Sequence, residues 1–391
     1  MIAVTSIGTP GGQTSGDPLA KQPGVEPRAR RTGRSAAVVF ITRSNIHLLR
    51  VFSPLTTLYR LNIVSMKPWR AAVVRAFGDP EKIQIQNRTD FPQLTSPNQA
   101  LIRVRFAGVN PVDTYIRAGQ YSVLPQLPYT PGREGSGTIE QIGDNVKNFE
   151  VGDQVWFTDP VTGSCADYAI AEKFYKLHND LSFAEGATLG IKYMTAYRAL
   201  FLKANAQAGQ TVLIHGASGG VGLAACQLAV ASSLKVVGTA STAEGRQLVR
   251  ENGADLVVDH SKGDYYDELI EAYPSGFDII LEMLANANLA RDFQLVANNG
   301  CIVVIGSRGT IEVNPRMLMV KEACVQGMLL TRSTREECEH MSAEIIRLLA
   351  QCTYRPIISK CFSLKQLPAA HRYMIEHTGA HGCVVIDMGL D

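Results

Sequence analysis

Residues 211–222, with the sequence Thr-Val-Leu-Ile-His-Gly-Ala-Ser-Gly-Gly-Val-Gly, restrict the possible fold more than any other stretch of the chain. The first five residues are short, apolar and partly β-branched, which is typical of a buried parallel strand. A glycine-rich turn follows, and residues 223–229 continue at helical spacing. Strand, glycine turn and helix in this order form the setting of a dinucleotide phosphate site.

Two glycines of this stretch have distinct expected tasks. Gly219 lets the backbone approach a pyrophosphate, and Gly222 lets the helix pack closely on the strand. The helix N-terminus offers free N–H groups and a partial positive charge to the phosphates. Ala217 stands at the first position of the usual fingerprint, so the pattern is Ala-x-Gly-x-x-Gly. A glycine turn where a helix merely crosses a strand is the alternative.

The length and composition indicate a globular protein of two domains. The chain has 391 residues, of which 46% are hydrophobic and 19% are charged, enough for two separate cores. No run of eighteen apolar residues exists, so we expect no membrane span. The eight cysteines are scattered without a Cys-x-x-Cys pair, which is typical of free thiols in a reducing compartment.

Residues 1–65 differ from the rest of the chain. They hold eight Lys or Arg against Asp17 and Glu26, a balance of +6, whereas the remainder is at about −4. Gly, Pro, Ser and Thr crowd the first thirty-five positions, which is typical of disorder. An Arg-rich, Ser-containing, acid-poor extension also fits an organellar transit peptide. An unstructured tail, or a true start at Met66, are the alternatives.

The two halves of the remainder differ in their pattern. Short strands with turn signals between them predict a small β-barrel, at residues 70–75, 82–86, 101–108, 135–143, 154–157 and 165–170. From about Thr195, strands alternate with helix-length segments, which predicts a doubly wound parallel sheet, with strands at 211–215, 235–240, 255–258, 277–282 and 300–305. A helix at 336–350 and a return at 357–391 follow.

Several motifs outside the glycine turn resemble one family, at residues 107–119, 127–132, 190–200, 282–286 and 306–311. Together they are similar to the zeta-crystallin-like quinone oxidoreductases among the medium-chain dehydrogenase/reductases. The resemblance implies a GroES-like domain at 66–193, a Rossmann domain at 194–330 and a C-terminal return at 331–391. It also implies NADPH in the cleft between the domains, where strand ends and domain interfaces favour ligands.

Zinc is not expected. Zinc-dependent members of the family have Cys, a His-Glu pair and Cys at positions where this chain has Asn110, Arg133-Glu134 and Ile191. Asn, Arg and Ile are not normal zinc ligands. Without a Lewis acid to polarise an alcohol, hydride delivery to an acceptor that is already electrophilic is favoured over alcohol oxidation.

The end of the second Rossmann strand indicates the cofactor. An NAD site normally has an acidic residue there, which accepts from the ribose 2′-OH, whereas this chain has Ser241. Arg246 and His260 lie downstream as positive partners for a 2′-phosphate, and the resemblance puts Ser241 and His260 beside it. Glu244 as a displaced NAD-type acid, or a plain solvated helix start, is the alternative.

The resemblance assigns the remaining site residues. Tyr115 and Asn110 would border the nicotinamide and act in catalysis, whereas packing for Tyr115 and a turn cap for Asn110 are the alternatives. The other cofactor contacts implied by the family are Thr195, Ser218, Gly219, Gly220, Val221, Asn288, Ile305, Gly306, Ser307, Arg308, Met328, Leu329 and Leu330. Arg308 could equally be a surface arginine.

These observations predict a cytoplasmic, zinc-independent, NADPH-dependent quinone reductase that assembles as a homo-oligomer. The family also implies activity on electron-poor enones. It further contains proteins that bind AU-rich RNA or serve as structural proteins, so an NADPH-holding RNA-binding protein with little turnover is the rival. The slightly acidic body from Met66 weakens that rival. A mitochondrial location would follow if residues 1–65 were a transit peptide.

Overall fold

The computed structural model describes residues 68–377, 379 and 381–390. The expectations for residues 1–65 therefore lie outside the described residues. Among the described helices, none is both long enough and apolar enough to cross a membrane.

A six-stranded sheet forms the centre of the nucleotide-binding half, and every strand pair in it is parallel. The spatial order is β10-β9-β8-β11-β12-β13, which is the Rossmann order 3-2-1-4-5-6. The strands are β8 (Thr211–Ile214), β9 (Lys235–Thr239), β10 (Leu256–Val258), β11 (Phe277–Glu282), β12 (Val296–Val304) and β13 (Cys324–Gly327). The doubly wound parallel sheet is confirmed.

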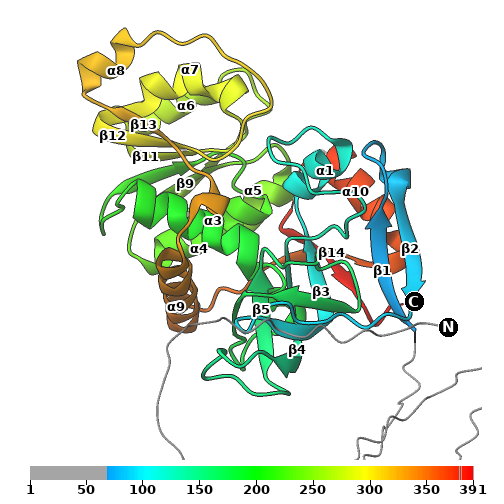
Figure 1. The fold of residues 1–391 in the computed structure, drawn as a ribbon. Coiled ribbons are helices and arrows are strands. Elements are labelled where there is room, and N and C mark those ends of the chain that lie inside the picture. The colour runs from blue at the N-terminus through cyan, green and yellow to red at the C-terminus, as the bar shows by residue number, and fades with distance from the viewer. Residues whose placement is uncertain (1–67, 378, 380, 391) are drawn as a thin grey trace, which may run out of the picture. The chain divides into compact units, whose positions relative to one another are not determined.

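Helices cover both faces of this sheet (Figure 1). They are α4 (Gly220–Ala231), α5 (Ala243–Glu251), α6 (Tyr265–Ala272), α7 (Ala285–Leu295) and α8 (Arg316–Lys321). Helix α4 is almost entirely buried from Gly222 to Ala229 because its small apolar side chains fit between the sheet and α9 (Arg335–Gln351). An all-round apolar helix of this kind is stable only in a core.

The barrel half is built on a sheet with the order β14-β15-β3-β4-β5-β7, and β6 pairs with β3. The strands are β3 (Ala100–Val109), β4 (Glu134–Ile142), β5 (Gln154–Thr158), β6 (Tyr168–Ala171), β7 (Lys173–Lys176), β14 (Ile358–Ser363) and β15 (Cys383–Asp387). A separate hairpin pairs β1 (Trp69–Val74) with β2 (Ile83–Arg88). Short helical segments complete it: η1 (Pro80–Lys82), α1 (Pro111–Ala118), η5 (Leu364–Gln366) and α10 (Leu367–Glu376).

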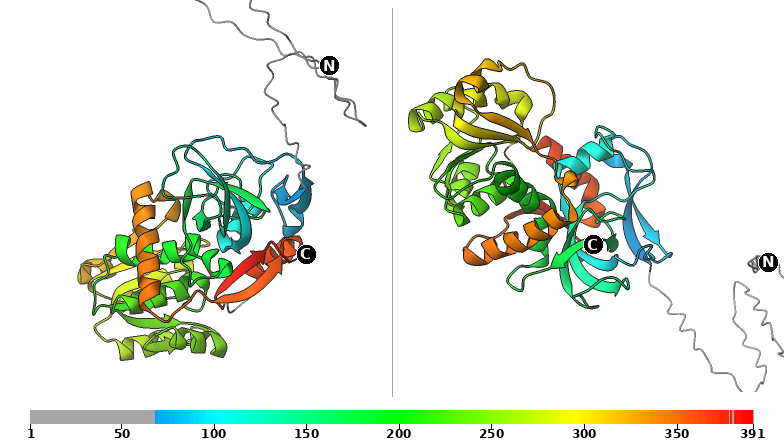
Figure 2. Two further views of the ribbon diagram at one scale, coloured as in Figure 1. Left: turned by 90° about the horizontal axis from the view of Figure 1, so that it is seen from below. Right: turned by 60° about the vertical axis from the view of Figure 1, so that its left-hand side comes forward.

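The C-terminal return is the strand β15, which pairs antiparallel with β3 near the start of the chain. Figure 2 shows these C-terminal elements beside the first strands of the barrel. Helix α9 belongs to the other half, since Met341 and Ile345 pack in the same core as Leu223. The domain boundaries stay predictions. Within the C-terminal segment, β14 and β15 are the strands that belong to the sheet of the barrel half.

A nearly continuous helical passage connects the barrel to the Rossmann sheet. It consists of α2 (Phe183–Gly186), the π-helical η2 (Leu189–Tyr193), α3 (Met194–Tyr197) and the π-helical η3 (Arg198–Lys203). A further short helix, η4 (Leu330–Arg332), follows β13. Most of the passage up to Leu200 is buried. Single-turn π segments are often found at functional sites, and this one contains two residues of the site described next, Ile191 and Lys192.

Candidate functional site

The residues expected to bind a cofactor lie where the six parallel strands end. The glycine turn follows β8, Ser241 follows β9, His260 follows β10, and residues 305–308 follow β12. Strand order reverses between β8 and β11, and ligands of open α/β sheets bind at the carboxyl ends of the strands at such a switch point. Tertiary structure thus brings these residues together at the carboxyl ends of the strands, which we call the nucleotide edge.

The glycine turn has the geometry expected from its sequence. Gly216 has a φ of +60°, in the left-handed region. A Cβ on Gly222 would lie 2.5 Å from the Gly216 carbonyl oxygen, so only glycine permits this close approach of helix and strand. Gly219 is the N-cap of α4, and Gly220 and Val221 are its first residues. N–H groups at a helix N-terminus favour an anion, so the structure is consistent with the expected phosphate contact at this turn.

Ser241, the uncharged residue just after β9, occupies the position that is expected to distinguish NADPH from NADH. Ser241 is partly buried, and the following Thr242 caps α5 by accepting from Gly245 N at 3.0 Å. The Arg246 guanidinium donates to the Ser241 carbonyl at 2.9 Å and pairs with Asp259 at 2.8 Å. Glu244 is exposed in the first turn of α5. The arrangement leaves a cation, rather than a carboxylate, in contact with Ser241.

His260 has a different electrostatic character from the one expected. Its Nδ1 lies 2.9 Å from Thr239 Oγ1, and burial, with a contribution from His215, lowers its pKa. His260 would therefore meet a phosphate as a neutral hydrogen-bonding group. Arg246 is the stronger candidate for the positive partner.

Three buried ionisable side chains form a cluster near the carboxyl ends of β8 and β11. They are His215 after β8, Glu282 at the end of β11 and Asp292 on α7. His215 Nε2 is 2.8 Å from Asp292 Oδ1 and 3.7 Å from Glu282 Oε2. Burial raises the pKa of Glu282 to about 7, assisted by Asp292 and opposed by His215. Burial disfavours the charged form of His215, but Asp292 and Glu282 outweigh it and raise its pKa. Glu282 Oε1 accepts from Asn288 Nδ2 at 3.2 Å, which orients a predicted cofactor contact.

A second cluster lies on the barrel side and contains Asn110. Asn110 begins α1, where its backbone N–H donates to Asp113 Oδ2 at 2.8 Å. Its side-chain amide donates to Glu134 Oε1 at 2.9 Å, while Glu134 Oε2 accepts from Ile191 N at 2.7 Å. Lys192 forms a buried ion pair with the same carboxylate. Asn110 thus both caps the helix and reaches the cluster.

Lys192 connects this cluster to the glycine turn. Its side chain is 5% exposed, and a Cβ on Gly220 would lie 2.9 Å from its Cδ. Burial disfavours the charged ammonium, but the Glu134 carboxylate outweighs this effect and raises the pKa of Lys192. A protonated lysine therefore lies against the first residue of α4.

The donor set of the barrel cluster does not fit a metal ion. The positions compared with the zinc ligands of relatives hold Asn110, Arg133-Glu134 and Ile191. Here Glu134 accepts from the Asn110 amide and from Ile191 N, while Arg133 pairs with Asp159. Both Glu134 oxygens are already engaged, and the Lys192 ammonium supplies the positive charge. Zinc prefers cysteine, histidine and free carboxylate ligands. Metal independence stays a prediction.

Tyr115 and Arg308 meet across the two halves of the molecule. Arg308 Nε donates to Tyr115 Oη at 3.1 Å, and the Arg308 backbone N–H donates to Asn286 Oδ1 at 2.7 Å. Tyr115 is partly buried on α1, so neither free exposure nor plain packing describes it. Thr195 is buried in α3, and Met328 is buried just after β13, with Leu330 partly buried beyond it.

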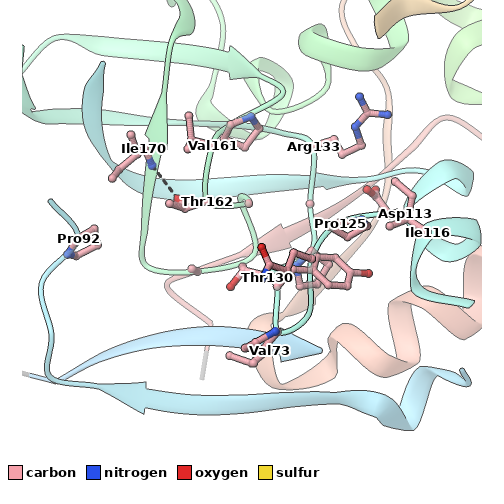
Figure 3. Close-up of a pocket in the computed structure, with 18 of the residues that line it drawn as sticks. Val73, Pro92, Asp113, Ile116, Pro125, Thr130, Arg133, Val161, Thr162 and Ile170 are labelled. Atoms are coloured by element: carbon pink, nitrogen blue, oxygen red, sulfur yellow. Dashed lines mark hydrogen bonds between the residues drawn. The ribbon is translucent and has the colours of Figure 1, made fainter. Parts of the chain in front are cut away.

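A cavity of about 920 Å³ is lined mainly by residues of the barrel half, including Asp113 and Ile116 on the helix that carries Tyr115. Figure 3 shows Asp113, Ile116 and Arg133 at one end and Pro92 at the other. Burial raises the pKa of Asp113 to about 6, and Arg133 is paired with Asp159. Leu329 reaches the cavity from the Rossmann half. The glycine turn is not among its lining residues, so the cavity is a candidate substrate site distinct from the nucleotide edge.

Sequence reasoning missed the C-terminal segment that lies over the glycine turn. Gly382 N–H donates to the Ser218 carbonyl at 2.8 Å, and His381 Nε2 lies 2.6 Å from Thr242 Oγ1. No local pattern in residues 377–382 indicates this contact, because the partners are more than 130 residues away. The ion pair of Lys192 with Glu134 was also missed, because 58 residues separate the two partners.

A GroES-like barrel joined to a Rossmann sheet, with a nucleotide edge facing a polar cluster and a cavity, defines a medium-chain oxidoreductase fold. Comparison with known proteins agrees. The family model for the alcohol dehydrogenase GroES-like domain matches residues 96–206, and the model described as zinc-binding dehydrogenase matches residues 220–347. The second name refers to the family as a whole.

Curated relatives narrow the assignment. The chain is 45% identical to a quinone oxidoreductase of Homo sapiens over 324 residues, which cover 82% of this chain and 98% of the relative. A quinone oxidoreductase of Mus musculus is 43% identical, with the same coverage. A solved structure of Escherichia coli quinone oxidoreductase complexed with NADPH is 26% identical with a TM-score of 0.72, over 81% of this chain and 99% of that chain. The chain belongs to the quinone oxidoreductases of the medium-chain dehydrogenase/reductase family.

Proposed function

We propose that this protein reduces quinones with NADPH and does so without zinc. The observation that supports this most is the closed Asn110–Glu134–Lys192 network beside the glycine turn. Relatives that act on alcohols need a Lewis acid at this place, whereas this network has no free ligand for one. A quinone is already electrophilic and needs hydrogen-bond donors and correct positioning instead.

The residues at the strand ends fit NADPH. The N–H groups of Gly220 and Val221 at the start of α4 would bind the pyrophosphate. Ser241 and Arg246 would bind the 2′-phosphate, because the Arg246 guanidinium, which also pairs with Asp259, lies against Ser241 and donates to its carbonyl. Asn288 and residues 305–308 would lie along the rest of the NADPH molecule. When bound, NADPH supplies the hydride, and the chain's residues bind, orient and protect it from water.

The acceptor ring would lie at the inner end of the cavity, near Asp113, Ile116 and Arg133. Reduction places negative charge on a quinone oxygen, so nearby donors that are already positioned lower the barrier. Tyr115 on the same helix is held by Arg308 and can donate its phenolic proton, while Arg308 adds positive charge. Asn110 keeps the start of this helix in place.

The test is NADPH oxidation measured across quinones, enones and aldehydes of similar size. Quinones should give the highest kcat/KM, and unactivated aldehydes should give none. A clear preference for enones would assign the protein to enone reduction. Saturable NADPH binding without turnover of any acceptor would favour the rival, a cofactor-holding structural or RNA-binding protein.

The assembly is proposed to be a homo-oligomer that associates through β13. This strand is at the edge of the six-stranded sheet, and Val325 on it and Met319 and Val320 beside it are exposed. An exposed apolar edge strand tends to pair with another chain, and a two-fold axis beside β13 would continue the sheet into a second copy. Light scattering of the wild type and of Val325→Asp tests this, since the variant should shift toward monomer.

RNA binding and the cellular compartment stay predictions. A basic, salt-sensitive surface is what binding to AU-rich RNA requires. Titration of an AU-rich oligonucleotide at several salt concentrations tests it, with a steep salt slope expected for true phosphate contacts. Imaging of the full chain and of a form starting at Met66 tests whether residues 1–65 direct the protein to mitochondria or leave it in the cytoplasm.

A further inference from the structure

The mouth of the cavity gathers exposed apolar side chains. Val123 is 75% exposed, Val161 56%, Leu329 45% and Leu124 40%, and all four line the cavity. Large apolar side chains scattered singly on a surface need no explanation, but a group around one opening marks a binding groove. They come from the loop after α1, the loop after β5 and the segment after β13, so tertiary structure assembles the group.

The lining of the cavity varies in polarity. Asp113 and Arg133 lie at one end (Figure 3), and Tyr129 Oη in the same lining is buried without a hydrogen-bond partner among the described residues. Val73 and Ile170 lie in the wall, and the four exposed apolar side chains belong to the same lining. A cavity that combines buried polar groups with apolar side chains matches a ligand with a polar head and an apolar tail.

The lining also contains a charged region. It holds the Arg88–Asp90 ion pair, with the Arg88 guanidinium over the Trp69 ring at 5.6 Å. The volume of about 920 Å³ is near the top of the range for small-molecule sites, roughly 300–1,000 Å³. A single ring at the inner end would leave most of this space, and the exposed mouth, in contact with water.

We propose that the acceptor is a quinone with an alkyl or prenyl chain, whose ring lies at the Asp113–Arg133 end and whose chain covers Val123, Leu124 and Val161. The inference rests on the proposed function for the ring and adds the chain. Each buried methylene should improve binding by up to about fourfold. The gain should stop once the chain reaches the Arg88–Asp90 pair.

The experiment uses 1,4-benzoquinones with a graded series of alkyl chains, measured in two ways. The first is kcat/KM with NADPH. The second is quenching of Trp69 fluorescence without cofactor, which reports binding independently of turnover. Trp69 lines the cavity, whereas Trp156, the other tryptophan, is fully buried in the core. Trp69→Phe should remove the quenching and so identifies its source.

The variant is Val123→Asp combined with Leu124→Asp, and its matched control is Val151→Asp. Val151 is 63% exposed and does not line the cavity. Wild type and control should bind longer chains more tightly up to a plateau. In the double variant, the affinity for a chain-bearing quinone relative to that for the unsubstituted quinone should fall by at least tenfold. The reason is that a chain cannot displace water from two carboxylates without cost.

The outcomes separate the two claims. Equal affinity for all chain lengths in the wild type would overturn the inference while leaving quinone reduction intact. The same loss in the Val151→Asp control would also overturn it, because the tighter binding of longer chains would then come from contacts outside the cavity. Tighter binding of flat fused-ring quinones with the same number of carbons would replace the chain with an aromatic ligand. Chain-dependent quenching without turnover of any quinone would contradict the proposed function alone.

Discussion

Tyr115 Oη accepts a hydrogen bond from Arg308 Nε at 3.1 Å, although 193 residues separate the two. One residue lies on the first helix of the barrel half and the other follows a strand of the Rossmann half. The contact links the two halves of the molecule. The contact also favours a joint role for the two residues. Taken singly, the tyrosine would suggest only packing and the arginine only a solvated surface position.

The first prediction concerns this contact. Tyr115→Ala should lower kcat/KM about tenfold or more with little change in Tm, because Tyr115 is only partly buried. A hydrogen bond to a charged group contributes about 1.5–3 kcal/mol, and less where it is exposed. Tyr115→Phe and Arg308→Met with the double variant form a cycle, and the two losses should be less than additive. Equal losses of Tm and activity in Tyr115→Ala would assign it to packing.

The second prediction concerns cofactor choice. Ser241→Asp should weaken NADPH use by one to two decades in kcat/KM, because the new carboxylate repels the 2′-phosphate and competes for Arg246. NADH use should rise, because the carboxylate accepts from the ribose 2′-OH. Both cofactors are compared at fixed ionic strength, since salt screens the phosphate interaction. A wild type that uses NADH as well as NADPH would contradict this reading of Ser241.

The third prediction concerns the buried ion pair of Lys192 with Glu134. Lys192→Met should lower the free energy of unfolding by about 3–5 kcal/mol, because it leaves a carboxylate buried without its cation. Adding Glu134→Gln should recover much of this loss. The Gln oxygen can accept from Ile191 N, and its NH2 can donate to Asn110 Oδ1 once the Asn110 amide turns over. Urea unfolding of both variants measures the difference. A double variant as unstable as the single one would show that the charges are not coupled.

The fourth prediction concerns pH. Glu282 has a raised pKa of about 7, so its carboxyl binds more of a proton in the folded state than in the unfolded state between about pH 5 and 7. The Glu282 contribution to the free energy of unfolding should therefore fall as pH rises through this window, by roughly 1 kcal/mol per pH unit. Asp113, whose pKa is raised to about 6, acts in the same direction as Glu282. Buried His371, whose pKa is lowered to about 3, contributes the opposite slope over the acid part of the window, so the Glu282 contribution is the difference between wild type and a glutamate variant.

The control for the pH prediction is a pair of glutamate variants. Glu282→Gln should flatten the dependence, because it keeps an acceptor for Asn288 but cannot titrate. Exposed Glu244→Gln should keep the wild-type slope. Denaturant unfolding at several pH values gives both. An unchanged slope in Glu282→Gln, or an equal change of slope in Glu244→Gln, would contradict the prediction.

The fifth prediction concerns metal. Dialysis against a chelator should leave quinone reduction unchanged, and elemental analysis should find no stoichiometric zinc. Among the described residues, His215, Glu282 and Asp292 have ligand atoms within 4.8 Å of one another and form the one group with metal-like spacing. If zinc were found, its loss in His215→Asn would locate it there. Stoichiometric zinc that this variant retains would contradict the reading of the barrel cluster instead.

Much of the fold could be predicted because local pattern and tertiary role agree. The predicted strand at 277–282 and helix at 336–350 match β11 and α9 closely. The strand β13 was missed because its four residues are mostly exposed and lack the apolar run of a central strand. The strand β7 was missed because Lys173 and Lys176 flank only two aromatic residues. Edge strands have weak sequence signals, since fewer of their side chains are buried.

The sequence by itself determined the nucleotide half of the site. The strand, glycine turn and helix at 211–222 are contiguous, and Gly222 is required by contacts within that same stretch. The neutral Ser241 at a strand end is equally local. Family resemblance added Tyr115, Asn110 and Arg308 as separate positions without relating them to one another.

Only the tertiary structure decided how those positions act together. Lys192 meets Glu134 across 58 residues, Arg308 meets Tyr115 across 193, and Gly382 meets the glycine turn from the end of the chain. The cavity likewise combines loops from three parts of the sequence. Such contacts depend on strand order and on which side chains are buried opposite one another, and periodicity within a short window contains neither.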